Sequence, residues 1–336
     1  MVKITTDWHV STKRIAGTTT QSRLDLTEAI YGALEKALDP DFDHIIAGDL
    51  YDGFDVDAKD VLRTFLILSN YLTASGKILV LLRGNHDHTA KDSKVSGFEL
   101  IAQLLESQFP AQVVIVREVT HWKDFVFVPH LINNDVLKLE VEKLTTLANK
   151  VFVFHANFDN PFCSGDHSLN VTREMADSLL HSGNIILFGH EHQYREIGDI
   201  TCLGNTYPSS ISDALGGPKF AWYVGDDIYN ECTWHPEGEF AKLDWRNLED
   251  VDPALKFIRV GGDASANEAA DAVAAIAKLR QNHNAFVITN AVMVEGMGTE
   301  MEEASLESLK AFDVLSALLE VLDPKEQEVV KELLTC

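Results

Sequence analysis

The sequence is poor in cysteine, in basic residues and in long apolar runs. Four of its 336 residues are cysteines, and no Cys-x-x-Cys pair occurs, which argues against a disulfide framework and a zinc finger. No apolar run approaches the length that crosses a bilayer, and no apolar stretch of the signal-peptide type follows Met1. These absences predict a protein of a reducing cytoplasm with no membrane partner.

Acidic residues outnumber basic ones by 52 to 28, which gives a formal net charge of −24. This balance argues against a protein that binds nucleic acid through its overall charge alone. It leaves a nucleic-acid substrate open, because bound dications offset negative charge locally and a partner can supply a basic surface. The length allows one large α/β domain with a smaller one beside it.

Short apolar runs alternate with helical patterns through the first two-thirds of the chain. Helical periodicity is clear at 22–38 and 58–72, where leucines recur on one side. Strands are predicted at 113–116 and 125–128, and five more at 2–6, 44–47, 77–82, 151–154 and 185–188. Strands that alternate with helices predict a buried, layered α/β architecture.

Each of these five strands ends at a short turn rich in Asp, Asn and His. Ligands gather beyond the strand ends of such sheets, so we expect the turns to converge on one site. The side chains that would meet there are Asp7, His9, Asp49, Asn85, His155, His190 and His192. Two further candidates in the same turns are His86 and Asp52.

The seven gathered side chains mix carboxylate, amide and imidazole groups without a thiolate. This donor set suits Mn²⁺, Fe²⁺ or Zn²⁺. Seven ligands are too many for one ion with an open position, but they fit two ions about 3.5–4 Å apart that share a carboxylate, as in two-metal hydrolases. A histidine beside such ions, here His86, can stabilise the transition state or protonate a leaving oxygen. Asp52 can hold its orientation.

Five motifs occur in order along the chain: Asp-x-His, Gly-Asp-x-x-Asp, Gly-Asn-His-Asp, a lone His after a strand, and Gly-His-x-His. Together they resemble the calcineurin-like metallophosphoesterase superfamily, which implies a layered sheet sandwich flanked by helices. The resemblance implies a first metal held by Asp7, His9, Asp49 and His192. It implies a second metal held by Asp49, Asn85, His155 and His190. It also makes His86 the catalytic histidine, with Asp52 in support.

A narrower resemblance begins at Leu203 and runs to Ser210. This segment is similar to the Tyr-Pro-Gly-Ser-Pro-like segment of SbcD nuclease subunits, although Ser209 and Ile211 stand where Gly and Pro are usual. The resemblance implies a Mn²⁺-dependent DNA exonuclease or endonuclease subunit for double-strand break repair or recombination, in a bacterial or phage-infected cytoplasm. It also implies a homodimer that works with an SbcC-like coiled-coil ATPase.

The last third of the chain fits that layout. A strand at 256–260, a helix at 267–282 and a strand at 285–289 predict a small α/β capping domain. An amphipathic helix at 306–322 and a short one at 325–334 are expected to dock the ATPase. We therefore expect a nuclease domain at 1–225, a capping domain at 226–298 and a partner-docking segment at 299–336.

Two other functions use the same sequence features. A phosphodiesterase or phosphatase that acts on a small molecule needs the same metals but no docking helix. A non-catalytic scaffold subunit would carry a vestigial metal site, and the complete ligand set argues against it.

Overall fold

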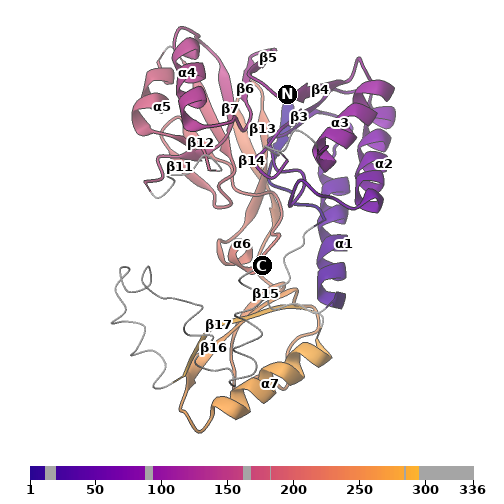
Figure 1. Ribbon diagram of the computed structural model, residues 1–336, viewed down its shortest axis with the longest axis vertical. Coiled ribbons are helices and arrows are strands. Elements are labelled where there is room, and N and C mark those ends of the chain that lie inside the picture. Colours follow the sequence, from indigo (N-terminus) through magenta and orange to yellow (C-terminus); the bar gives the residue numbers. More distant parts are fainter. Residues whose placement is uncertain (12–19, 88–93, 162–167, 182, 284, 295–336) are drawn as a thin grey trace, which may run out of the picture.

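The computed structural model describes residues 1–11, 20–87, 94–161, 168–181, 183–283 and 285–294. These residues form two six-stranded sheets packed face to face, with a small three-stranded sheet below them (Figure 1). Within them, no helix is both long and apolar enough to span a membrane. The helices expected at 306–322 and 325–334 lie outside the described residues.

The first sheet has the strand order β14-β13-β1-β2-β3-β4. Its strands are β1 (Val2–Thr5), β2 (Asp43–Ile46), β3 (Leu79–Leu82), β4 (Val113–Val116), β13 (Lys219–Val224) and β14 (Ile228–Trp234). β1 to β4 are parallel, and β13 joins β1 antiparallel. Three helices cover the outer face: α1 (Thr20–Ala37), α2 (Ala58–Ser75) and α3 (Gly97–Gln108).

The second sheet has the strand order β11-β12-β10-β7-β6-β5. Its strands are β5 (Thr120–Trp122), β6 (Phe125–Val128), β7 (Val151–His155), β10 (Ile185–Gly189), β11 (Arg195–Ile197) and β12 (Ile200–Cys202). On its outer face lie α4 (Asn134–Leu144), α5 (Arg173–Leu179) and the paired short strands β8 (Asn157–Phe158) and β9 (Asn170–Val171).

An apolar layer between the two sheets forms the centre of the sandwich. In β3, Val80 and Leu82 face this layer, while Leu79 and Leu81 face the helices. Because both faces of the strand are buried, its sequence is a continuous apolar run. The seven strands expected in this part of the chain are all present, four in the first sheet and three in the second.

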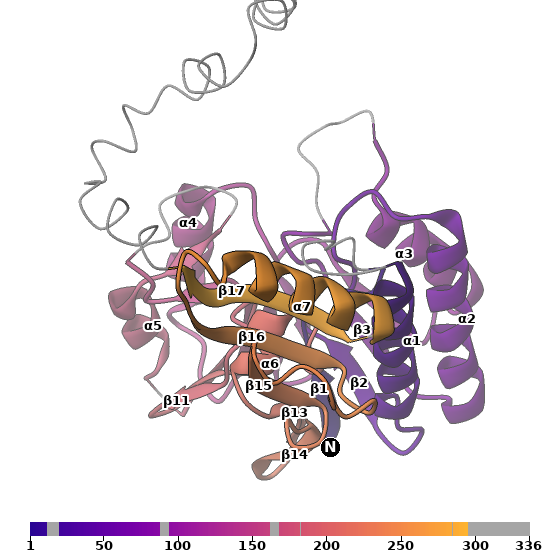
Figure 2. The same cartoon turned by 90° about the horizontal axis from the view of Figure 1, so that it is seen from below.

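The third sheet is the structural core of a small βαβ unit. Its parallel strands are β15 (Phe240–Asp244), β16 (Phe257–Ala264) and β17 (Phe286–Val294), and α7 (Ala269–Asn282) covers one face (Figure 2). The short helix α6 (Ile211–Leu215) packs against β16 and β17. The expected boundary at residue 226 falls in the turn between β13 and β14, inside the first sheet, so this third sheet begins only at Phe240.

Candidate metal centre

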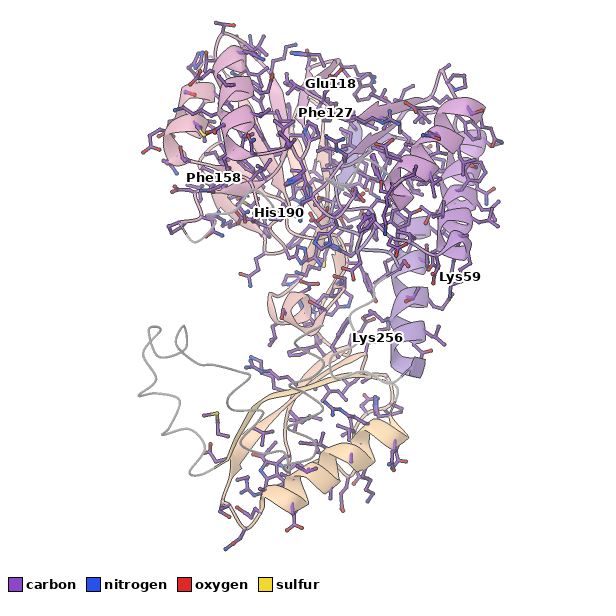
Figure 3. All side chains as sticks on the ribbon, in the orientation of Figure 1. Lys59, Glu118, Phe127, Phe158, His190 and Lys256 are labelled. Carbon is purple, nitrogen blue, oxygen red and sulfur yellow. The ribbon has the colours of Figure 1, made fainter. Side chains whose placement is uncertain are left out.

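The five polar turns meet at one end of the sandwich. They follow β1, β2, β3, β7 and β10, and His190 lies between the two halves of the sandwich, toward the third sheet (Figure 3). Four site residues have left-handed backbone angles that non-glycine residues rarely adopt: φ is 52° for Asp7, 45° for His9, 46° for Asp49 and 81° for His190. Each such conformation costs about 1–3 kcal/mol, and such strain clusters at functional sites.

The first cluster joins Asp7, His9 and His192. The two Nε2 atoms of the histidines lie 3.0 Å apart, and Asp7 Oδ1 lies 3.9 Å from the first and 3.8 Å from the second. Two ligand atoms that each lie about 2.1 Å from one ion are at most about 4.2 Å apart, so all three spacings fit a shared ion. Asp7 Oδ1 is also buried without a hydrogen-bond partner, and a cation would satisfy it.

The second cluster joins Asp49, Asn85, His155 and His190. His155 Nδ1 donates to the carbonyl of Ala47 at 2.9 Å, so its Nε2 atom is left to face the cluster. That Nε2 atom lies 3.3 Å from Asp49 Oδ2 and 3.1 Å from Asn85 Oδ1. Asn85 Oδ1 also lies 2.9 Å from His190 Nδ1.

Asp49 lies between the two clusters. Its Oδ2 atom is 3.8 Å from His9 Nε2 and 3.3 Å from His155 Nε2. Its Oδ1 atom accepts the backbone N–H of His86 at 2.9 Å. One oxygen is therefore fixed by the main chain while the other faces both clusters, the arrangement that a bridging carboxylate needs.

The charges of the site favour cations. Burial alone would lower the pKa of His155, but the Asp49 carboxylate outweighs it and raises that pKa to about 9. Burial would raise the pKa of Asp49, yet His155 holds it well below its usual range. Burial and then the charge of His155 lower the pKa of His190 to about 4. The Asp49 carboxylate thus stabilises positive charge beside it, and His190 stays neutral near pH 7, as a metal ligand must be.

Two motif glycines leave room for these ligands. A Cβ atom on Gly48, whose φ is 100°, would lie 1.9 Å from His155 Nδ1. A Cβ atom on Gly84 would lie 2.0 Å from Asp49 Oδ1 and 2.4 Å from its backbone nitrogen. The Gly-Asp and Gly-Asn motifs therefore need glycine because ligand side chains lie against the backbone at these positions.

His86 lies beside both clusters, and Asp52 orients it through the main chain. His86 Nδ1 donates to the carbonyl oxygen of Asp52 at 2.8 Å, which directs Nε2 away from that carbonyl. The Asp52 carboxylate instead lies against His9, with Oδ1 3.3 Å from Nδ1. The His9 and His86 rings meet edge to face, with centroids 5.0 Å apart, and ligand atoms of these two histidines and Asp49 also lie close together.

The structure adds site residues that the sequence did not indicate. Asp213 accepts a hydrogen bond from the His192 ring, Lys219 binds the His192 carbonyl, and Thr6 donates to Asp7 Oδ2. Thr6 is adjacent to a predicted ligand, which is a signal that could have found it. Asp213 and Lys219 lie beyond the last motif and stand alone in their segments, so no spacing pattern marks them.

A comparison with protein-family models matches residues 1–194, more than half of the chain, to the calcineurin-like phosphoesterases. The chain belongs to this family. No curated protein matches it. Calcineurin-like phosphoesterases bind two divalent metals and hydrolyse phosphoesters, and the described residues supply candidate ligand groups for those ions. When bound, such ions polarise phosphoryl oxygens and activate water near neutral pH.

Proposed function

We propose that this calcineurin-like phosphoesterase is a Mn²⁺-dependent DNA nuclease subunit that acts in double-strand break repair or recombination. The observation that carries the proposal is the pair of adjoining ligand clusters, whose His190 lies on the side of the sandwich toward a separate βαβ unit (Figure 3). We extend the proposal to a cytoplasmic setting and to an SbcC-like ATPase partner. The docking segment at 299–336 lies outside the described residues.

The ligand atoms are compatible with manganese as the metal, as they are with Fe²⁺ or Zn²⁺. In the proposed assignment, Asp7, His9, Asp49 and His192 hold one ion, and Asp49, Asn85, His155 and His190 hold the other. Carboxylate, amide and imidazole donors without thiolate suit Mn²⁺. His86, whose Nδ1–H donates to the Asp52 carbonyl, would act as an imidazolium that gives its Nε2 proton to the departing sugar oxygen and is left as neutral imidazole.

Two basic side chains of the third sheet, Lys242 and Arg259, support the proposal that the substrate is DNA. Ile258 and Val260 of β16 pack toward α7, so Arg259 projects from the opposite face. Lys242 pairs with Arg259 in the β15–β16 register and shares that face. In Figure 1 this face is turned toward the sandwich, because α7 lies on the far side. Together with Leu243, Asp244, Gly261 and Gly262, these two cations line an open hollow of about 400 Å³. The two basic side chains outnumber its one carboxylate, which supports contact with phosphates of a bound strand.

Two neighbouring helices support the proposal of a homodimer. Leu62 and Leu66 of α2 are more than half exposed, and Leu100 and Leu104 of α3 are 43% and 45% exposed. Each pair has i, i+4 spacing and so shares one side of its helix, and α2 packs against α3. Exposed leucines on paired helices are the kind of surface that a symmetric dimer buries.

The test of the nuclease proposal is cleavage of linear duplex DNA by the purified full chain with Mn²⁺. The His86→Ala variant and bis(p-nitrophenyl) phosphate, a small diester, are assayed in parallel. We expect Mn²⁺-dependent DNA degradation that His86→Ala abolishes. If the small diester is cleaved while DNA stays intact, even after an SbcC-like ATPase is added, the protein is a small-molecule phosphodiesterase. If the protein binds metal but cleaves neither substrate, it is a scaffold subunit.

A further inference from the structure

Asp213 lies outside every sequence motif, yet its carboxylate reaches a metal-ligand candidate. Asp213 belongs to α6 and is 3% exposed. Its Oδ1 atom lies 2.7 Å from Nδ1 of His192. The other ring nitrogen, Nε2, is the one that faces His9 and Asp7. The carboxylate and the first cluster therefore hold opposite sides of one imidazole.

The carboxylate of Asp213 is itself fixed in direction. Its Oδ2 atom accepts the backbone N–H of Ser209 at 3.0 Å and the Ser209 hydroxyl at 2.9 Å. Its backbone N–H donates to the hydroxyl of Ser210, which caps α6. One oxygen is thus committed to Ser209, and the other is left to accept from the imidazole.

The backbone of His192 is held as firmly as its ring. Lys219 Nζ donates to the His192 carbonyl at 2.9 Å, and the Lys219 side chain is buried. The backbone N–H of Asn205 donates to the same carbonyl at 3.3 Å. His192 is therefore held at Nδ1 by Asp213 and at its backbone carbonyl by Lys219 and Asn205.

We propose that Asp213 is a positioning residue for the first metal site. By accepting from Nδ1–H, it keeps the proton on that nitrogen and leaves the Nε2 lone pair directed at Asp7 and His9. A carboxylate partner also raises the basicity of the ligating nitrogen. His155 of the second cluster instead donates to the neutral Ala47 carbonyl. Loss of the Asp213 charge therefore weakens one metal site and spares the other. The proposal rests on the metal centre and is independent of the DNA substrate.

The experiment titrates the metal-free full chain with Mn²⁺ and follows free Mn²⁺ by electron paramagnetic resonance. For Asp213→Asn, which keeps the side-chain shape, we expect one of two sites to weaken by about 10–100-fold, the usual effect of losing an outer partner of a ligand. Ser212→Ala is the matched control, because Ser212 is exposed on the same helix. We expect this control to bind like the wild type.

A second readout needs no metal. In the metal-free protein, ¹⁵N NMR should show His192 protonated at Nδ1 in the wild type and a shift toward the other tautomer in Asp213→Asn. Two unchanged Mn²⁺ sites, or equal weakening of both, would overturn the proposal. If Asp213→Asn does not fold, Ser209→Ala replaces it, because this variant removes one bond to Oδ2. It should weaken the same single site by a smaller factor, and unchanged binding would likewise overturn the proposal.

Discussion

The Nε2 atoms of His9 and His192 lie 3.0 Å apart, although 183 residues separate them in sequence. His9 follows β1 of the first sheet, and His192 follows β10 of the second. The first metal site therefore spans the sandwich and exists only when the two sheets are packed through their shared apolar layer. An ion held there binds the folded chain and not the unfolded one, so metal binding and folding are linked.

Removal of metal should therefore lower the melting temperature. At a free Mn²⁺ concentration about 100 times the dissociation constant, one site adds about 2.7 kcal/mol to the free energy of unfolding. We expect a chelator to lower the midpoint in differential scanning calorimetry and added Mn²⁺ to restore it. His192→Ala should reduce this metal-dependent gain. An equal gain in His192→Ala would contradict the linkage.

Substitution of His86 distinguishes a role in catalysis from a role in metal binding. If His86 acts on the leaving oxygen, His86→Ala should lower kcat by about 10²–10⁴-fold, the usual contribution of a general acid, while two Mn²⁺ ions remain bound. If it instead joins His9 and Asp49 as a ligand, metal content should fall as well. Metal analysis of the dialysed protein distinguishes these results. The control is His121→Ala, which removes an exposed imidazole of β5.

Gly84 tests whether the close approach of Asp49 to the backbone matters. Ala at this position would place a Cβ atom 2.0 Å from Asp49 Oδ1. We expect Gly84→Ala to cost about 1–3 kcal/mol of stability, as overpacking does, and to lower Mn²⁺ stoichiometry because the shared ligand moves. Gly53→Ala is the matched control, since no atom lies within 4 Å of its added Cβ. Similar thermal and metal titrations for both variants would refute the argument.

The proposed dimer should depend on the leucines of α2. Charge in an apolar interface opposes association, so Leu62→Glu with Leu66→Glu should convert the protein to a monomer in sedimentation experiments. Leu139→Glu on α4 is the control, because Leu139 is as exposed as Leu62 at 56%. A wild-type monomer, or a dimer that survives the double change, would refute this interface.

The sequence predicted the strands and the turns well because both follow local rules. A strand buried on both faces is a continuous apolar run, and β3 shows why: alternate side chains face the helices and the other sheet. Polar ligands at the ends of such runs stand out against that background. The seven metal-ligand candidates could therefore be identified from the sequence alone.

The pairing of strands far apart in the chain, and site residues outside the motifs, could not be predicted from the sequence. β13 and β14 complete the first sheet from more than 200 residues away, and periodicity alone does not show which strand a segment joins. Asp213 stands three residues after Ser210, the N-cap of α6, a spacing that is common at helix starts. Its contact with His192 depends on how the segment from Leu203 folds back against the turn after β10.

His44 gives a pH prediction away from the metal ligands. It is buried in β2, with Nε2 2.9 Å from the hydroxyl oxygen of Thr5. Burial, with the charge of Lys3, lowers its pKa from 6.5 to about 3. The folded protein thus keeps His44 neutral at pH values where the unfolded chain is protonated. Its contribution to stability is fully present above about pH 6.5 and is lost progressively as the pH falls toward 3.

Substitution of His44 should therefore flatten the acid side of the stability profile. One such group contributes a slope of up to about 1.4 kcal/mol per pH unit. The free energy of unfolding in urea, with chelator present, is compared between pH 4 and pH 7. We expect His44→Gln to lose stability less steeply with acid than the wild type. His121→Gln, with an exposed ring, should keep the wild-type slope. Parallel profiles for His44→Gln and the wild type would show that His44 is protonated as readily in the folded protein as in the unfolded chain.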